Sequence, residues 1–182
     1  MKRALAVDLI IALGLLGAGL IFWAVITDDQ PTCAADRYLV GAPELPDGWS
    51  VNFDCDPQSE VAGLANYRTS EITIWPLAHD SHDAVKWTAW HEIGHAYDHA
   101  YLTDAEREAW RALRGLSEGP WRDRYDISNI DLALWSATPE EDWAESFAVC
   151  HGRDPALARS VDFDPPERAE CRLMRSLIRS GS

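Results

Sequence analysis

The sequence predicts an α+β domain that is mainly helical. One short stretch alternates polar and apolar residues as a strand does, and four longer segments after it carry helix start signals. Strands and helices do not alternate regularly along the chain, which argues against a parallel α/β sheet. With 182 residues, 47% of them hydrophobic, and nine tryptophans, the chain is long enough for one modest core.

The strand is expected at residues 71–75, where the sequence reads Glu-Ile-Thr-Ile-Trp. Isoleucine and threonine favour extended backbone, and Pro76 closes the stretch. Residues 28–58 are rich in proline, glycine and aspartate, so an irregular linker region is expected there. The folded domain is then expected at 59–182.

The helices are marked by residues that favour helix ends. Ser81 or Asp83 can cap the first, and Thr103 with Glu106 has the reciprocal spacing of a capping box at the start of the second. The expected helices run to about Ala100, to Arg114 before Gly115, from Thr138 to about Val149, and from Pro166 towards Ile178. A loop is expected from Gly119 to Ile130.

The N-terminus indicates a membrane anchor. Leu9 through Ile26 is an uninterrupted apolar run of 18 residues, long enough to cross a bilayer as a helix. Lys2 and Arg3 before it place the N-terminus in the cytoplasm. Residues 1–27 are therefore predicted to be an uncleaved signal anchor and transmembrane helix, with the rest of the chain outside. The alternatives are secretion after signal cleavage and, less favoured by its polar lead-in, lipidation of Cys33.

Four cysteines fit an oxidising compartment. Three pairings are open, and Cys33–Cys55 with Cys150–Cys171 closes the shortest loops. No Cys-x-x-Cys pair is present, which argues against a cysteine metal site.

The formal net charge of −14 argues against a nucleic-acid partner. Cationic substrates or partners are favoured on electrostatic grounds. The oligomeric state is not set by the sequence.

The stretch His91-Glu92-Ile93-Gly94-His95 points to metal chemistry. Positions i and i+4 share one face of a helix, so His91 and His95 can bind one ion, and Glu92 can take a proton from a metal-bound water. His99 cannot join them, because eight residues of helix span roughly 12 Å.

A zinc hydrolase needs a third protein ligand. The extension His-x-x-Gly-x-x-His is absent, since Asp98 and Tyr101 occupy those places. Glu141 and Glu145 offer two carboxylates on one helical face, one to bind metal and one to orient a histidine. Spacing alone does not assign the two roles, and Glu141 also fits a capping box with Thr138.

The segments HEIGHAYD and PEEDWAESFA resemble the zinc peptidase domain of the anthrax lethal factor type, in the larger group that includes thermolysin. The resemblance covers roughly residues 72–151. It implies a mainly helical, zincin-like metallopeptidase domain with a small sheet. The same resemblance implies zinc on His91, His95 and Glu141, Glu92 as general base, and Glu145 as partner of a ligand histidine. It also implies an edge strand that holds an extended substrate, for which residues 71–75 are the matching candidate.

The chain departs from this family before the third-ligand helix, where members commonly carry a tyrosine that stabilises the oxyanion. Candidates to replace it are Tyr125, Tyr97, Trp135 and His151. The expected function is peptide-bond hydrolysis by a membrane-anchored, extracytoplasmic zinc endopeptidase acting on a peptide or protein substrate. The alternative is a non-catalytic surface binding or structural protein that retains a zinc-stabilised domain.

Overall fold

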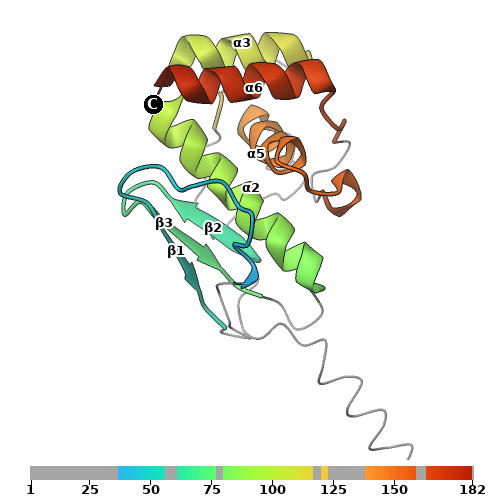
Figure 1. The fold of residues 1–182 in the computed structure, drawn as a ribbon. Helices are drawn as coiled ribbons and strands as arrows, with labels where there is room; N and C mark the ends of the chain where they lie inside the picture. The colour runs from blue at the N-terminus through green and yellow to red at the C-terminus, as the bar shows by residue number, and fades with distance from the viewer. Residues whose placement is uncertain are drawn as a thin grey trace, which may run out of the picture.

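The computed structural model describes residues 37–55, 61–76, 80–116, 120–122, 138–158 and 163–181. They form a three-stranded sheet, four α-helices and one short 3-10 helix (Figure 1). In chain order these are β1 (Ser50–Phe53), β2 (Gly63–Asn66), β3 (Glu71–Ile74), α2 (His82–Tyr101), α3 (Asp104–Arg114), α5 (Pro139–Cys150), η3 (Pro155–Leu157) and α6 (Arg168–Gly181). The predicted α+β class is confirmed.

The predicted strand is present, but its expected place at the edge of the sheet is wrong. The strand order is β1-β3-β2, with β1 parallel and β2 antiparallel to the central β3. The partner on one side, β1, comes from the stretch 28–58, so the expectation of irregular structure does not hold at Ser50–Phe53. Among the strands that the structure describes, β1 and β2 therefore form the edges.

The sheet packs against α2, which crosses it in Figure 1. Ile72 and Ile74 of β3 are fully buried, because alternate residues of a strand face the same side. Trp87, Trp90 and Ile93 of α2 belong to the same apolar core. A helix buried on this scale is held by packing on the sheet and the neighbouring helices rather than by helix propensity alone.

The predicted helix ends are largely confirmed. Ser81 caps α2, with its hydroxyl accepting from the Ala84 N–H at 3.1 Å. The capping box of Thr103 and Glu106 opens α3, and Gly115 ends it at φ 64°, a left-handed conformation that glycine adopts without strain. The fourth helix begins two residues later than Pro166, at Arg168.

The helix α5 lies unusually close to α2. A Cβ atom at Gly94 would stand 3.0 Å from the Cα atom of Ala144, so the backbones meet where a side chain is missing. The indole N–H of Trp143 donates to the carbonyl oxygen of Gly94 at 3.0 Å. These contacts bring the acidic start of α5 beside the histidines of α2.

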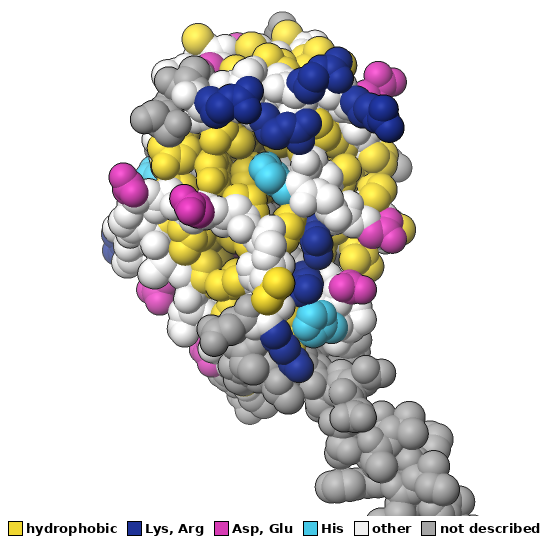
Figure 2. All heavy atoms as spheres, in the orientation of Figure 1, with side chains coloured by type: hydrophobic (Ala, Val, Ile, Leu, Met, Phe, Trp, Pro, Cys, Tyr) yellow, Lys and Arg dark blue, Asp and Glu magenta, His cyan; other side chains and the backbone are white. Residues whose placement is uncertain are grey.

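The predicted disulfide between Cys150 and Cys171 is confirmed and ties α5 to α6. The other expected pair includes Cys33, which lies outside the described residues. The exposed side of α6 is basic, and Figure 2 shows dark-blue side chains gathered over this helix. Its arginines recur at helical spacing, at positions 168, 172, 175 and 179.

No helix within the described ranges is both long enough and apolar enough to cross a membrane. The apolar run Leu9–Ile26 lies outside those ranges, so the predicted anchor stays a prediction.

Candidate metal centre

Three side chains from α2 and α5 converge on one point. The Nε2 atoms of His91 and His95 are 3.0 Å apart. Glu141 Oε2 is 3.1 Å from His91 Nε2, and Glu141 Oε1 is 3.3 Å from His95 Nε2. Two atoms bound to one zinc ion at about 2.0–2.1 Å with tetrahedral angles are separated by about 3.3 Å. This buried group of two imidazoles and a carboxylate can hold a metal ion.

Each histidine also has a carboxylate behind it. His91 Nδ1 is 3.6 Å from Glu145 Oε2, and His95 Nδ1 is 3.6 Å from Glu140 Oε1. Both separations exceed a normal hydrogen bond, but they place an acceptor at the ring nitrogen that faces away from the shared carboxylate. Histidine ligands of metals are commonly oriented in this way.

Glu145 is fixed by a residue that sequence reasoning missed. The indole N–H of Trp87 donates to Glu145 Oε2 at 2.8 Å, and Glu145 is 1% exposed. Trp87 lies one turn before His91 on α2, and this spacing could have indicated that the two side chains share one face of the helix. Glu145 lies behind His91, not His95.

Glu140 was also missed, because an acidic residue in the first turn of a helix is common without any site. Its Oε1 accepts from the Tyr67 hydroxyl and lies 2.7 Å from Arg122 Nε. Burial and the adjacent Glu140 carboxylate raise the pKa of Tyr67, which keeps the hydroxyl protonated as a donor.

Glu141 does not use its carboxylate for the capping box that its spacing allows. The Thr138 hydroxyl accepts from the backbone N–H of Glu141 at 3.4 Å and thereby caps α5. The side chain of Glu141 turns to the two histidines instead. One residue thus takes part in both the helix cap, through its backbone, and the metal group, through its side chain.

The side chain of Glu92, which belongs to α2, faces the strand β2. It is 6% exposed and accepts a hydrogen bond from the backbone of Ala65. Burial raises the pKa of Glu92, while the nearby imidazoles of His95 and His91 act to lower it. A carboxylate with a raised pKa is suited to accept and return a proton near neutral pH.

The metal-free group is held together by charge. Burial acts to lower the pKa of His91, but Glu145 and Glu141 raise it to about 10. Burial acts to raise the pKa of Glu141, but His95 and His91 lower it to about 2. These shifts favour protonated imidazoles, so a metal ion would compete with protons for the two histidines.

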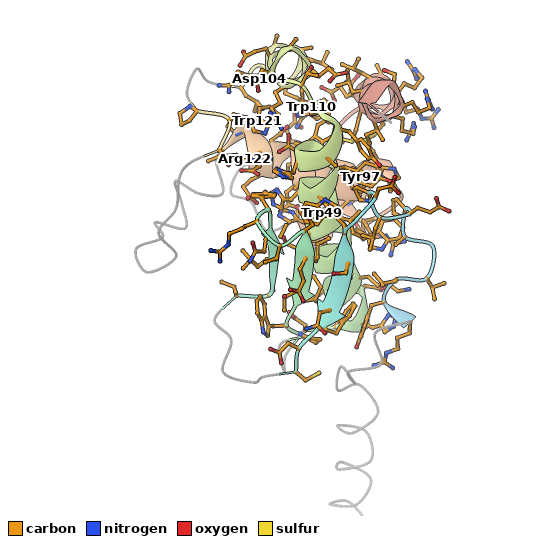
Figure 3. The ribbon with its side chains drawn as sticks, turned by 90° about the vertical axis from the view of Figure 1, so that its left-hand side faces the viewer. Trp49, Tyr97, Asp104, Trp110, Trp121 and Arg122 are labelled. Atoms are coloured by element: carbon orange, nitrogen blue, oxygen red, sulfur yellow. A yellow bond between two sulfur atoms is a disulfide. The ribbon has the colours of Figure 1, made fainter. Side chains whose placement is uncertain are left out.

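Neither described candidate for oxyanion stabilisation points into this group. The Tyr97 hydroxyl donates to the backbone carbonyl oxygen of Glu44 at 2.6 Å, and Figure 3 shows Tyr97 on the opposite side of α2 from Arg122. His151 follows Glu141 by ten residues, roughly 15 Å along a helix. Tyr125 and Trp135 lie outside the described residues.

His99 is exposed and takes no part in the metal group. Its ring stacks on Tyr67 with centroids 4.9 Å apart. The sequence predicts that His99 cannot join His91 and His95. In the structure the third residue of that group is Glu141.

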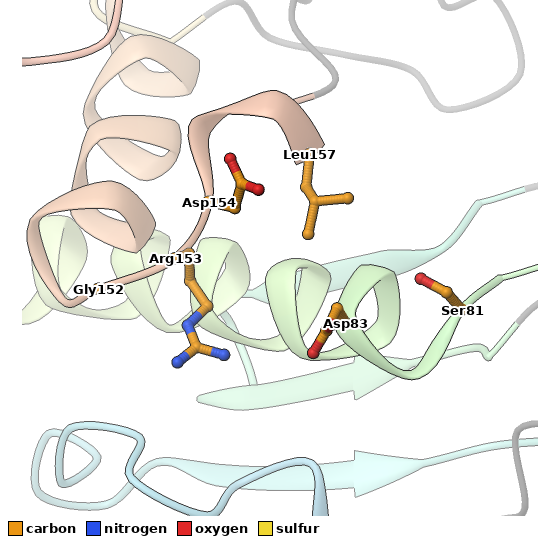
Figure 4. Close-up of a pocket in the computed structure, with 6 residues that line it drawn as sticks. All are labelled: Ser81, Asp83, Gly152, Arg153, Asp154 and Leu157. Atoms are coloured by element: carbon orange, nitrogen blue, oxygen red, sulfur yellow. The ribbon is translucent and has the colours of Figure 1, made fainter.

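A surface hollow elsewhere on the molecule is separate from the metal group (Figure 4). It is lined by Ser81 and Asp83 at the start of α2 and by residues 152–154 and 157. Beside this hollow, the guanidinium carbon of Arg153 lies 4.0 Å from the centroid of the Trp90 ring. None of the three metal-group residues lines this hollow.

No protein-family model matches the chain, and neither a curated protein nor a solved structure gives a significant match. Any functional assignment therefore rests on the side chains around His91, His95 and Glu141.

Proposed function

We propose that the chain is a zinc metallopeptidase that hydrolyses peptide bonds with Glu92 as the general base. The observation that carries the proposal is the buried group of His91, His95 and Glu141, whose ligand atoms face one another across 3.0–3.3 Å. Two imidazoles and one carboxylate form a set that zinc hydrolases use, with a fourth position left for water or substrate.

These residues would hold the ion, and zinc when bound supplies a Lewis acid that activates water and polarises a carbonyl. Glu92 accepts the proton of the attacking water and returns it to the leaving amine. The Ala65 N–H holds this carboxylate against β2, and burial raises its pKa towards the range of a general base. Glu145 and Glu140 orient His91 and His95 from behind.

An extended peptide fits the open edge of β2 better than β3. The central β3 is paired on both sides, whereas β2 is paired only with β3 among the described strands. β2 also lies directly on Glu92, through Gly63 and Ala65. Backbone groups at an open strand edge can bind a peptide as an added strand.

We place the domain outside the cytoplasm, anchored by the transmembrane helix that the sequence predicts at its N-terminus or, alternatively, secreted. Support comes from the apolar run Leu9–Ile26 with Lys2 and Arg3 before it. The disulfide between Cys150 and Cys171 agrees, since such bonds persist in oxidising compartments.

A non-catalytic protein with a zinc-stabilised domain is the second candidate. The observation that favours it is that neither Tyr97 nor His151, the described oxyanion candidates, faces the metal group. Loss of one oxyanion donor typically costs about 10²–10³ in rate.

Metal analysis and peptide-library cleavage by the chain, with wild type beside Glu92→Gln, separate the two candidates. Zinc in both proteins with cleavage by the wild type alone supports the peptidase. Zinc in both with cleavage by neither supports the structural protein, and a wild type without zinc contradicts both.

A further inference from the structure

The Nδ1 side of His95, which faces away from Glu141, is formed by the Glu140 carboxylate together with the side chains that hold it. Glu140 is 6% exposed, and its Oε1 faces His95 Nδ1 at 3.6 Å. This is an ion-pair separation, and a carboxylate on that side of a ligand histidine helps to orient its ring. Anything that holds Glu140 in place therefore acts on the ligand.

Two side chains hold that same oxygen. The Tyr67 hydroxyl donates to Glu140 Oε1, and Arg122 Nε lies 2.7 Å from it. The guanidinium of Arg122 also covers the Tyr67 ring, 4.1 Å from its centroid. A buried carboxylate is costly unless it is paired and hydrogen-bonded, so these two partners stabilise Glu140 where it is.

Arg122 is itself anchored on α2. Besides its contacts with Glu140 and Tyr67, Arg122 forms an ion pair with Asp98, which is 0% exposed. Asp98 also accepts a hydrogen bond from the Trp121 indole N–H at 3.1 Å. The Glu140 N–H donates to the Trp121 carbonyl oxygen at 3.2 Å. Figure 3 shows Trp121 and Arg122 beside α2. Through their contacts with Asp98 and Glu140 they join the C-terminal part of α2 to the start of α5.

We infer that Arg122 is a positioning residue of the metal centre, which acts through Glu140 on the ligand His95. The stretch Trp121–Arg122, from outside both metal-binding helices, is then a functional part of the site although none of its atoms is a ligand. This inference rests on the proposed function, because the proposed function is what assigns zinc to the site.

The test is the zinc dissociation constant of the full chain, measured by competition with a chromophoric chelator below the unfolding temperature. Arg122→Gln removes the charge beside Glu140 and should weaken zinc binding about 10–100-fold, the range for residues that orient a ligand. Arg107→Gln is the matched control: Arg107 pairs with the same Asp98 at 2.8 Å but has no described contact with Glu140. Its zinc affinity should stay near that of the wild type.

A double-mutant cycle tests the route through Glu140. If Arg122 acts through that carboxylate, Arg122→Gln adds little in a chain that already carries Glu140→Gln. Losses that add fully in the double variant would overturn the route. Arg122→Lys keeps the charge but not the planar fork, so it should give an intermediate loss and replaces Arg122→Gln should that variant not fold.

The outcomes distinguish this inference from the proposed function. Tight zinc binding by the wild type with equal affinity in Arg122→Gln overturns the inference and leaves the proposed function standing. Equal losses in Arg122→Gln and Arg107→Gln also overturn it, because Asp98 would then be the common cause. A wild type that binds no zinc overturns both.

Discussion

Gly63 on β2 and Glu92 on α2 are in such close contact that a methyl group has no room between them. A Cβ atom at Gly63 would lie 2.7 Å from both Cγ and Oε1 of Glu92, and 2.8 Å from Cγ2 of Thr88. The edge strand therefore approaches the proposed base only because residue 63 has no side chain. The same strand supplies the Ala65 backbone group that Glu92 accepts from.

Gly63→Ala should therefore reduce catalysis more than metal binding. The added methyl pushes the Glu92 carboxylate from its place, while His91, His95 and Glu141 keep theirs. We expect kcat to fall at least tenfold, and overpacking to cost about 1–3 kcal/mol of stability. Peptide cleavage and zinc titration of the same preparation measure the two effects.

Thr88→Ser provides the control for this substitution, because serine lacks the Cγ2 atom that the new methyl would also meet. The double variant should regain stability but not activity. Full recovery of activity in the double variant would show that Thr88, rather than Glu92, is the residue disturbed.

Glu92→Gln and His95→Ala should fail in different ways. Glutamine fills the same space but cannot carry the proton, so zinc binding stays and cleavage falls by about 10²–10⁴. His95→Ala removes a ligand atom and should weaken zinc binding itself. Zinc content and cleavage rate are the readouts, and equal zinc loss in both variants would make Glu92 a structural residue.

The two carboxylates on one face of α5 should also separate. Glu141 faces both Nε2 atoms, so Glu141→Ala should largely empty the site. Glu145 lies behind His91, so Glu145→Ala should weaken zinc by only about 10–100-fold. Isothermal titration of both variants decides the order. Tight binding by Glu141→Ala beside an empty Glu145→Ala would reverse the roles.

Trp87→Phe is the matched control for Glu145. It keeps an aromatic side chain, smaller than the indole, and removes the N–H that donates to Glu145. Its effect on zinc affinity should be smaller than that of Glu145→Ala and in the same direction.

Local signals explain which parts of this molecule were predictable. Helix caps act within one turn, so sequence alone predicts the capping box at Thr103 and narrows the first cap to Ser81 or Asp83. His91 and His95 lie one turn apart on one helix, so their pairing is predictable as well. β1 was missed although Ser-Val-Asn-Phe alternates polar and apolar residues, because four residues are a short signal within a stretch rich in proline, glycine and aspartate. Its pairing with β3 is a tertiary contact that no local pattern predicts.

Three residues around the site, Tyr67, Glu140 and Arg122, could not be predicted for the same physical reason. Tyr67 and Glu140 are 73 positions apart, and no local pattern links them. Arg122 meets Asp98 and Glu140 only after α2 and α5 have packed. Sequence thus predicts the pair His91 and His95, which share one helix. The choice of Glu141 over Glu145 came from the family resemblance, and residues that meet the site only through tertiary contacts were missed.

The charge of the metal-free group gives a dependence of stability on pH. The folded pKa of His91 is about 10, above its ordinary value of 6.5. A raised histidine pKa stabilises the fold fully below the unfolded pKa, and this contribution is lost as pH rises through the folded pKa. The unfolding temperature of chelator-treated protein should therefore fall between about pH 6.5 and pH 10.

Zinc should have the opposite dependence, because it binds neutral imidazoles and competes with their protons. The rise in unfolding temperature on adding zinc should grow across the same pH range, by mass action on the folded state. Differential scanning calorimetry with and without zinc measures both trends, and His91→Gln should flatten them, which separates the imidazole pair from other groups that titrate there. If the metal-free wild type instead gains stability from pH 6.5 to pH 10, the imidazoles are already neutral, and Glu141 and Glu145 do not hold protons on them.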